Sequence, residues 1–107
     1  MFYNVKARYI PSAAPEFYRK LTDGTIMQQK PDGAEIVGSM QRARVTPDGV
    51  VQWSEKCYCQ TPLAHERSTV HDKYFIDLET EEVDGYVSFE GKPFMDVLAE
   101  EASKIGD

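Results

Sequence analysis

The residues Thr46-Pro47-Asp48-Gly49 constrain the fold more than any other part of this sequence, because they join two alternating segments. Proline and aspartate suit the centre of a type I turn, and glycine suits the left-handed residue that follows and forms a bulge. This loop predicts a hairpin of residues 36–46 and 50–60 in which Thr46 faces Val50. The chain is therefore expected to form an antiparallel sheet.

The register of this hairpin predicts which side chains share its core face, since alternate residues of a strand point the same way. We expect the core to include Val37, Ala43, Val45, Val51 and Trp53. The predicted pairs across the hairpin are Val45 with Val51, Ala43 with Trp53, Gln41 with Glu55, Ser39 with Cys57, and Val37 with Cys59.

The spacing of apolar residues and the positions of proline and glycine predict the other elements. Thr61-Pro62 begins either a turn or a short helix, and these alternatives stay open. The predicted elements are a strand over 2–10, a helix from Pro15 to about Gly24, a strand over about 70–79, a short strand at 86–89, and a helix from Pro93 to Gly106.

Helices on one face of an antiparallel sheet of about four strands make a two-layer α+β sandwich. If residues 61–70 are helical, the leading arrangement is ferredoxin-like. A chain of 107 residues is expected to be a single domain, because two halves would each have a marginal core.

Composition excludes several functional classes. With 41% hydrophobic and 28% charged residues, the chain resembles an ordinary globular protein. No apolar run approaches the roughly 20 residues that span a bilayer, and residues 1–8 do not resemble a signal peptide. The net charge of −6 opposes nucleic-acid binding, which requires a cationic surface. A cytoplasmic protein with neither membrane nor nucleic-acid partners is expected.

Glu55 is the first candidate functional residue, because the register places it on the core face. A buried carboxylate is costly unless it is paired, and burial raises its pKa toward the range of a general acid or base. Gln41, opposite Glu55, is a possible hydrogen-bond donor. The alternative is that no helix covers this end of the sheet, so that Glu55 is solvated or pairs with an arginine such as Arg19.

The two cysteines and two histidines do not have the spacing of a metal site. Cys57 and Cys59 are separated by one residue, whereas paired zinc ligands favour two to four. We therefore expect no metal or other cofactor, and two small core thiols. His65 is predicted at the rim of a pocket, as a second catalytic candidate, while Glu66 and Arg67 are interpreted as surface residues.

The outward face of the predicted sheet is basic, and it is the candidate binding surface. Acidic residues gather elsewhere, at 77–84 and 96–101. The acidic connection folds over this face, a second subunit docks there, or an anionic ligand binds it; alternatively the face is simply solvated. Its predicted members are Lys6, Arg8, Arg42, Arg44, Lys56 and Tyr58, with Met40, Gln52 and Ser54 beside them and Gln41 as a further binding residue.

Three functional hypotheses follow. The favoured one is a non-enzymatic binding or accessory module, as a homodimer, that recognises an anionic small molecule or an acidic protein partner through the basic face. The alternative is a small enzyme in which Glu55 acts as general acid or base, assisted by Ser39, Gln41, Cys57 or His65. The third is a structural subunit of a larger complex that makes contacts through residues 79–84 and the last helix.

Overall fold

The computed structural model of this chain describes residues 1–57, 61 and 63–105. They form one five-stranded sheet in the order β4-β1-β3-β2-β5, and every neighbouring pair is antiparallel. The strands are β1 (Phe2–Tyr9), β2 (Arg44–Val45), β3 (Val51–Lys56), β4 (Phe75–Val83) and β5 (Lys92–Pro93). The predicted α+β fold is confirmed, with two very short strands at one edge; the ferredoxin-like arrangement stays a prediction.

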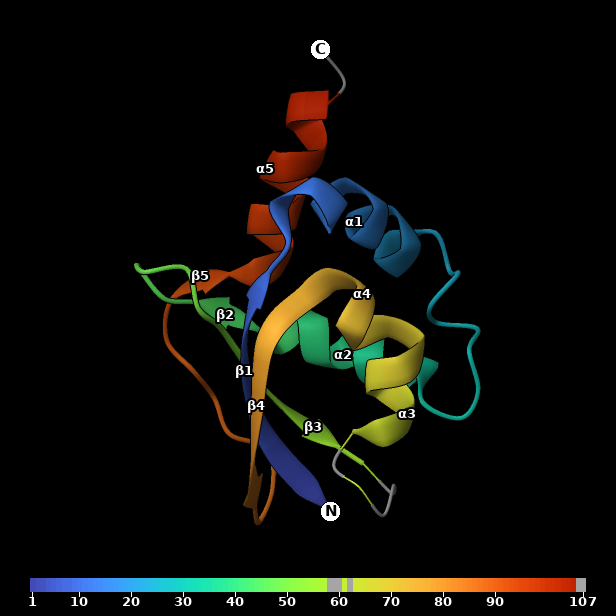
Figure 1. The fold of residues 1–107 in the computed structure, drawn as a ribbon, viewed down its shortest axis with the longest axis vertical. Helices are drawn as coiled ribbons and strands as arrows, with labels where there is room; N and C mark the ends of the chain where they lie inside the picture. The colour runs from blue at the N-terminus through green and yellow to red at the C-terminus, as the bar shows by residue number, and fades with distance from the viewer. Residues whose placement is uncertain (58–60, 62, 106–107) are drawn as a thin grey trace.

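The helices cover one face of the sheet, and Figure 1 shows α1, α2, α3 and α4 together on that side. The long helices are α1 (Ala14–Thr22), α2 (Gly33–Arg42) and α5 (Phe94–Ile105). A 3-10 turn over Pro11–Ala13 precedes α1. A continuous helical segment precedes β4 and consists of α3 (Ala64–Glu66), a wider π-helical turn over Arg67–His71, and α4 (Asp72–Tyr74).

The predicted turn forms, but the first arm of the predicted hairpin is wrong. Gly49 has φ +88° and its N–H donates to the Thr46 carbonyl at 2.9 Å. Val45 opposes Val51, as predicted. Residues 33–42, however, are helical, so Gln41 does not pair with Glu55, nor Ser39 with Cys57. Val37 is likewise in α2, and its predicted partner Cys59 lies outside the described residues.

The spacing of apolar residues explains why residues 33–42 form a helix. The side chains that α2 buries include Ile36, Val37 and Met40, which follow the three-and-four spacing of one helix face. The two-residue alternation from Val37 to Val45 overlaps this pattern, and Ala43, where α2 ends, is also buried. Met40, predicted on the outward face, is therefore completely buried instead.

The strand predicted over 70–79 begins later than expected. Residues up to Tyr74 are helical and β4 runs from Phe75 to Val83. Val70, a β-branched residue, is buried within the π-helical turn, so tertiary packing overrides its local strand preference. The short strand predicted at 86–89 is also wrong, because these residues have no regular structure.

Aromatic rings join the two layers. The Phe17 ring of α1 stacks on Tyr74 with centroids 4.2 Å apart and meets Phe75 edge-on. Trp53, on the inner face of β3, lies 5.0 Å from Phe75. These contacts hold the end of the helical segment against the sheet. Within the described residues, none of the helices is long and apolar enough to cross a membrane.

Candidate functional site

Glu55 lies on the inner face of β3 and its side chain is fully buried. Trp53 Nε1 donates a hydrogen bond to Glu55 Oε1 at 2.7 Å, and His71 Nε2 lies 3.1 Å from the same oxygen. The partner of Glu55 is therefore His71. The predicted partners are wrong: Gln41 is exposed on α2, and Arg19 pairs with Asp23.

The local backbone explains how these groups meet. Trp53 and Glu55 are two residues apart on a strand, so their side chains leave on the same face. A π-helical turn, with its five-residue hydrogen-bond spacing, brings residues five apart toward one side. Glu66 and His71 accordingly are both buried. The prediction of Glu66 as a surface residue is wrong, because only 2% of its surface is exposed.

Glu66 adds a second buried carboxylate. The Cys57 thiol donates to Glu66 Oε2 at 3.7 Å, and Cys57 is buried, as predicted. Burial raises the pKa of Glu66, and the nearby negative charges of Glu55 and Asp32 raise it further. Glu66 is thus the member of this cluster whose protonation depends on the charges of both Glu55 and Asp32.

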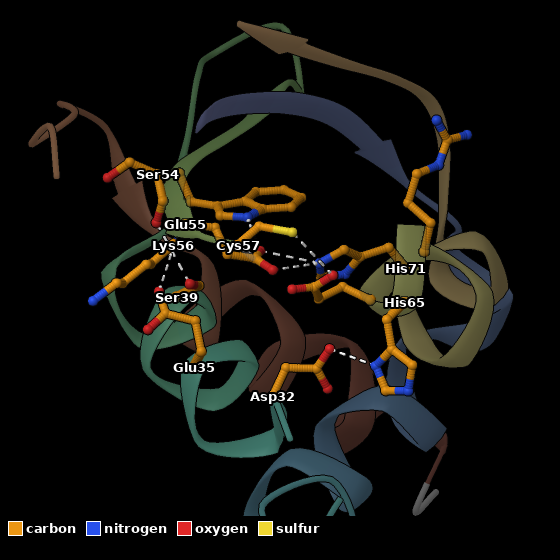
Figure 2. Close-up of polar contacts among 12 residues, drawn as sticks. Asp32, Glu35, Ser39, Ser54, Glu55, Lys56, Cys57, His65 and His71 are labelled. Carbon is orange, nitrogen blue, oxygen red and sulfur yellow. Dashed lines mark hydrogen bonds and ion pairs between the residues drawn. The ribbon is translucent and has the colours of Figure 1, made fainter. Parts of the chain in front are cut away.

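His65 is paired with Asp32, the N-cap residue that immediately precedes α2. Their Nδ1 and Oδ2 atoms are 2.5 Å apart, and the side chains are 40% and 11% exposed. Figure 2 shows the two side chains pointing toward one another from different elements. The hydrogen bond with Asp32 raises the pKa of His65. Within the described part of the chain, His65 Nε2 has no partner, so it is the accessible nitrogen.

Asp32 gives up its usual local role to make this contact. An aspartate at the N-cap normally accepts a hydrogen bond from a backbone N–H in the first turn of the helix, a contact worth about 1 kcal/mol. Asp32 occupies the N-cap position of α2 without such a bond. Its carboxylate instead reaches His65, 33 residues away.

The glycine after Asp32 is required by a close approach. A Cβ atom at Gly33 would lie 2.1 Å from the Ile26 carbonyl oxygen. The segment 25–32 therefore packs directly on the first residue of α2, and this contact helps to place Asp32 opposite His65.

The backbone before His65 is also unusual. Leu63 has φ +56° and is fully buried, although a branched residue rarely adopts the left-handed region. Such strain of about 1–3 kcal/mol persists only where the surrounding structure enforces it, and it concentrates at functional sites. Three local departures from ordinary geometry thus converge here: the uncapped Asp32, the left-handed Leu63 and the π-helical turn.

This arrangement separates two kinds of group. Glu55 and His71 are sealed in the core, where His71 Nε2 faces the Glu55 carboxylate and the buried His71 Nδ1 has no hydrogen-bond partner among the described residues. His65, in contrast, presents a nitrogen to solvent and is held by a nearly buried carboxylate. An oriented imidazole of this kind can accept or donate a proton. No group of three or more His, Cys, Asp or Glu side chains among the described residues is arranged to hold a metal ion.

The residues of the predicted basic face do not act as one surface. Lys6 and Arg8 are exposed on β1, and Arg44 lies on β2 opposite Gln52. Arg42 is at the end of α2 and contacts the Ser54 carbonyl, the Ser39 hydroxyl and Glu35. Lys56 lies over the Phe2 ring. Tyr58 lies outside the described residues.

Acidic residues share the outward face with these cations. Glu79 pairs in register with Lys6, and Glu81 pairs with Asn4. The predicted separation of acids from the basic face is therefore wrong, because residues 75–83 form the strand beside β1. The acidic residues 77–83 thus lie beside the cations of β1 in the sheet. Among the alternatives given for the basic face, this agrees best with the one in which the acidic connection contacts it.

Part of the outward face is covered by residues 84–91, which link β4 to β5 (Figure 1). The Val87 N–H donates to the Ser54 hydroxyl at 2.9 Å, and that hydroxyl lies 3.2 Å from the Val87 carbonyl. The Tyr86 hydroxyl donates to Glu35, and its ring packs against Arg42 and Phe2. The covered half lies toward the start of β1, so the open half contains Lys6 and Arg8.

Comparison with protein-family models, with functionally described proteins and with solved structures finds no match to this chain. The function is therefore argued from the site alone. The sequence contained one signal for the site, the histidine segment after Thr61, but Asp32 was not singled out and Glu66 was interpreted as a surface residue. Their roles depend on contacts between distant parts of the chain.

Proposed function

We propose that this protein is a small enzyme that carries out general acid–base chemistry at His65, with Asp32 as the residue that orients it. The observation that carries the proposal is the 2.5 Å contact between a nearly buried aspartate and a histidine whose side chain is 40% exposed. A carboxylate that accepts a hydrogen bond from Nδ1–H fixes the tautomer and leaves Nε2 free to react.

In this mechanism the Nε2 lone pair of His65 takes a proton from a C–H, O–H or S–H group of the substrate. The imidazolium that forms is stabilised by Asp32, and it returns the proton to the product or to water. Because the pKa of His65 is raised, the neutral imidazole is a stronger base than a free histidine, but less of it is present at neutral pH.

Glu55 has a different role in this proposal from the one the sequence suggested. Both of its oxygens lie within 3.4 Å of His71 Nε2, and Oε1 also accepts from Trp53. It is fully buried, so it is a positioning residue that holds β3 against the helical segment carrying His65.

The test uses 5-nitrobenzisoxazole, whose ring opens after a single proton abstraction and releases a coloured phenolate. Wild-type protein is expected to accelerate ring opening, and His65→Gln to lose at least about tenfold of that rate, since a positioned base contributes about 10²–10⁴-fold. Asp32→Asn should lower the plateau rate and move the rise with pH to lower pH. Arg67→Gln, an exposed neighbour in the same helical segment, is the matched control and should leave the rate unchanged.

Equal rates for wild type and His65→Gln across the pH range would contradict the proposal. A pH profile that Asp32→Asn does not move would contradict the orienting role of Asp32 in particular.

A second candidate function is the binding of a charged ligand on the open half of the outward face. It is favoured by two adjoining grooves over β1 that are both lined by Lys6. Of the predicted basic surface, Lys6 and Arg8 are the residues that would contribute to this binding site. Arg42 already contacts Glu35, Ser39 and Ser54, so it contributes less to such a site.

Self-association into a homodimer and a cytoplasmic location are further proposals from the sequence. Native mass spectrometry of the purified protein tests the first: a dimer supports it, and a monomer over the working concentration range contradicts it.

A further inference from the structure

The open half of the outward face contains a charged groove. It consists of two adjoining hollows of about 460 Å³ and 520 Å³, which share Lys6 and Glu79. Strand β1 forms the floor and β4 forms one side. Phe89 lines the first hollow and Arg8 lines the second. Volumes of this size suit a small ligand.

The charges of this groove are of both signs, and among the described residues they form no ion pairs with one another. The cations are Lys6 and Arg8, and the anions are Asp77, Glu79 and Glu81. Within the described residues none of these five takes part in an ion pair, although Lys6 and Glu79 are direct neighbours across β1 and β4. Elsewhere, opposite charges do pair, as Lys92 and Glu100 do at 2.7 Å.

Arg8 retains donors for a ligand. One guanidinium nitrogen donates to the Asp48 carbonyl at 3.0 Å. An arginine carries five N–H groups in a planar fork that matches a carboxylate, so one contact to the turn fixes the side chain without exhausting it.

We propose that this groove binds a zwitterionic ligand of amino-acid or dipeptide size, an inference that rests on the second candidate function. The ligand carboxylate is held by Lys6 and Arg8 on the floor. Its ammonium group faces the carboxylates along β4. Apolar groups of the ligand meet Val50, Leu78 and Phe89, which also line the groove.

Ligands of a single sign fit less well. A purely anionic ligand placed on Lys6 meets the carboxylate of the adjoining strand, and a purely cationic ligand placed on Glu79 meets Lys6 and Arg8. Like charges in contact are unfavourable, which is a general way in which sites discriminate. A ligand that carries both signs avoids both repulsions.

The experiment is an NMR titration of the uniformly ¹⁵N-labelled full chain with four forms of the dipeptide alanyl-leucine: free, N-acetylated, amidated, and blocked at both ends. The free form is expected to shift the amide signals of Lys6, Gln52 and Glu79. Each singly blocked form should bind about tenfold more weakly, because it loses one charge-assisted contact. Lys6→Gln and Arg8→Gln should weaken binding of the free form, while Lys73→Gln, which changes an exposed lysine of α4, should not.

Two results would overturn the proposal. If the N-acetylated form binds as tightly as the free dipeptide, the ligand is an anion; the zwitterion inference fails while the binding function stands. If no form shifts the groove signals at millimolar concentration, both the inference and the second candidate function fail.

Discussion

The two histidines of this chain, His65 and His71, are each bonded to a carboxylate but lie in opposite environments. His71 and Glu55 are fully buried, and Trp53 donates to the same carboxylate. His65 is 40% exposed on its side chain, and its partner Asp32 is 11% exposed. The two pairs have the same chemistry, yet only one of them can meet a substrate.

The difference shows that burial decides what an imidazole–carboxylate pair does. The sealed pair joins β3 to the helical segment through the contact between Glu55 and His71 Nε2, and removal of one partner leaves the other stranded in the core. A pair anchored at one end and open at the other holds a reactive nitrogen in place. The fold uses the sealed pair to support the element that carries the open one.

The largest expected effect is the loss of the sealed pair. Glu55→Ala leaves the Trp53 and His71 N–H groups without their acceptor, and we expect it to lower the free energy of unfolding by about 3–5 kcal/mol. Urea unfolding followed by circular dichroism measures this change. Glu90→Ala, an exposed glutamate, is the control and should stay within about 0.5 kcal/mol. Equal effects of Glu55→Ala and Glu90→Ala would show that the sealed pair of Glu55 and His71 does not stabilise the fold, and the contrast with the open pair would fail.

The next effect concerns Glu66, which lies between the two pairs. Its pKa in the folded protein is raised above its usual value of 4.5, first by burial. Its protonated form therefore stabilises the fold below that value, and this contribution is lost as pH rises through the folded-state pKa. Glutamine resembles the protonated acid, so Glu66→Gln should be more stable than wild type at about pH 8 by roughly 1 kcal/mol.

Unfolding curves at about pH 4 and about pH 8 check this sign, because the two proteins should differ little at the acidic end. A difference between the two proteins that is the same at both pH values would contradict the raised pKa of Glu66, because linkage requires it to change as Glu66 ionises. A destabilisation of Glu66→Gln that grows toward pH 8 would show that the ionised carboxylate fits the cluster.

A smaller effect distinguishes the two parts of the outward face. Arg42→Gln removes contacts with Ser54, Ser39, Glu35 and the Tyr86 ring, and should cost about 1 kcal/mol. Lys6→Gln removes a cation without an ion pair among the described residues and should change stability by less than about 0.5 kcal/mol. Thermal unfolding of both variants measures the difference; a larger cost for Lys6→Gln would mean that the groove charges stabilise the fold.

The sequence predicted the parts of the fold that depend on local chemistry. The turn at Thr46–Gly49 needs only proline, aspartate and a left-handed glycine, and it forms as predicted. The strand at 2–10 and the last helix have single, clear periodicities. Residues 36–42 were mistaken for part of a strand because apolar residues at helical spacing also alternate between Val37 and Ala43.

The candidate site was less accessible to prediction, because distant contacts define it. Glu55 was placed on the core face, where it lies fully buried, but its partner His71 comes from a π-helical turn that no local pattern announces. Asp32 precedes residues that were expected to form a strand, and only the structure shows that it occupies an N-cap position while its side chain reaches His65. Glu66 follows the partly exposed His65 in the chain, and the sequence does not show which of the two side chains the helix turns inward. In the structure it is Glu66 that is buried.

The central claim is that Asp32 holds His65 as an accessible acid–base group, and the titration of the His65 imidazole by NMR tests it most directly. We predict that His65 titrates with a pKa above its usual value of 6.5 and that Asp32→Asn lowers this pKa. A His65 titration at the ordinary value that Asp32→Asn leaves unchanged would contradict the account.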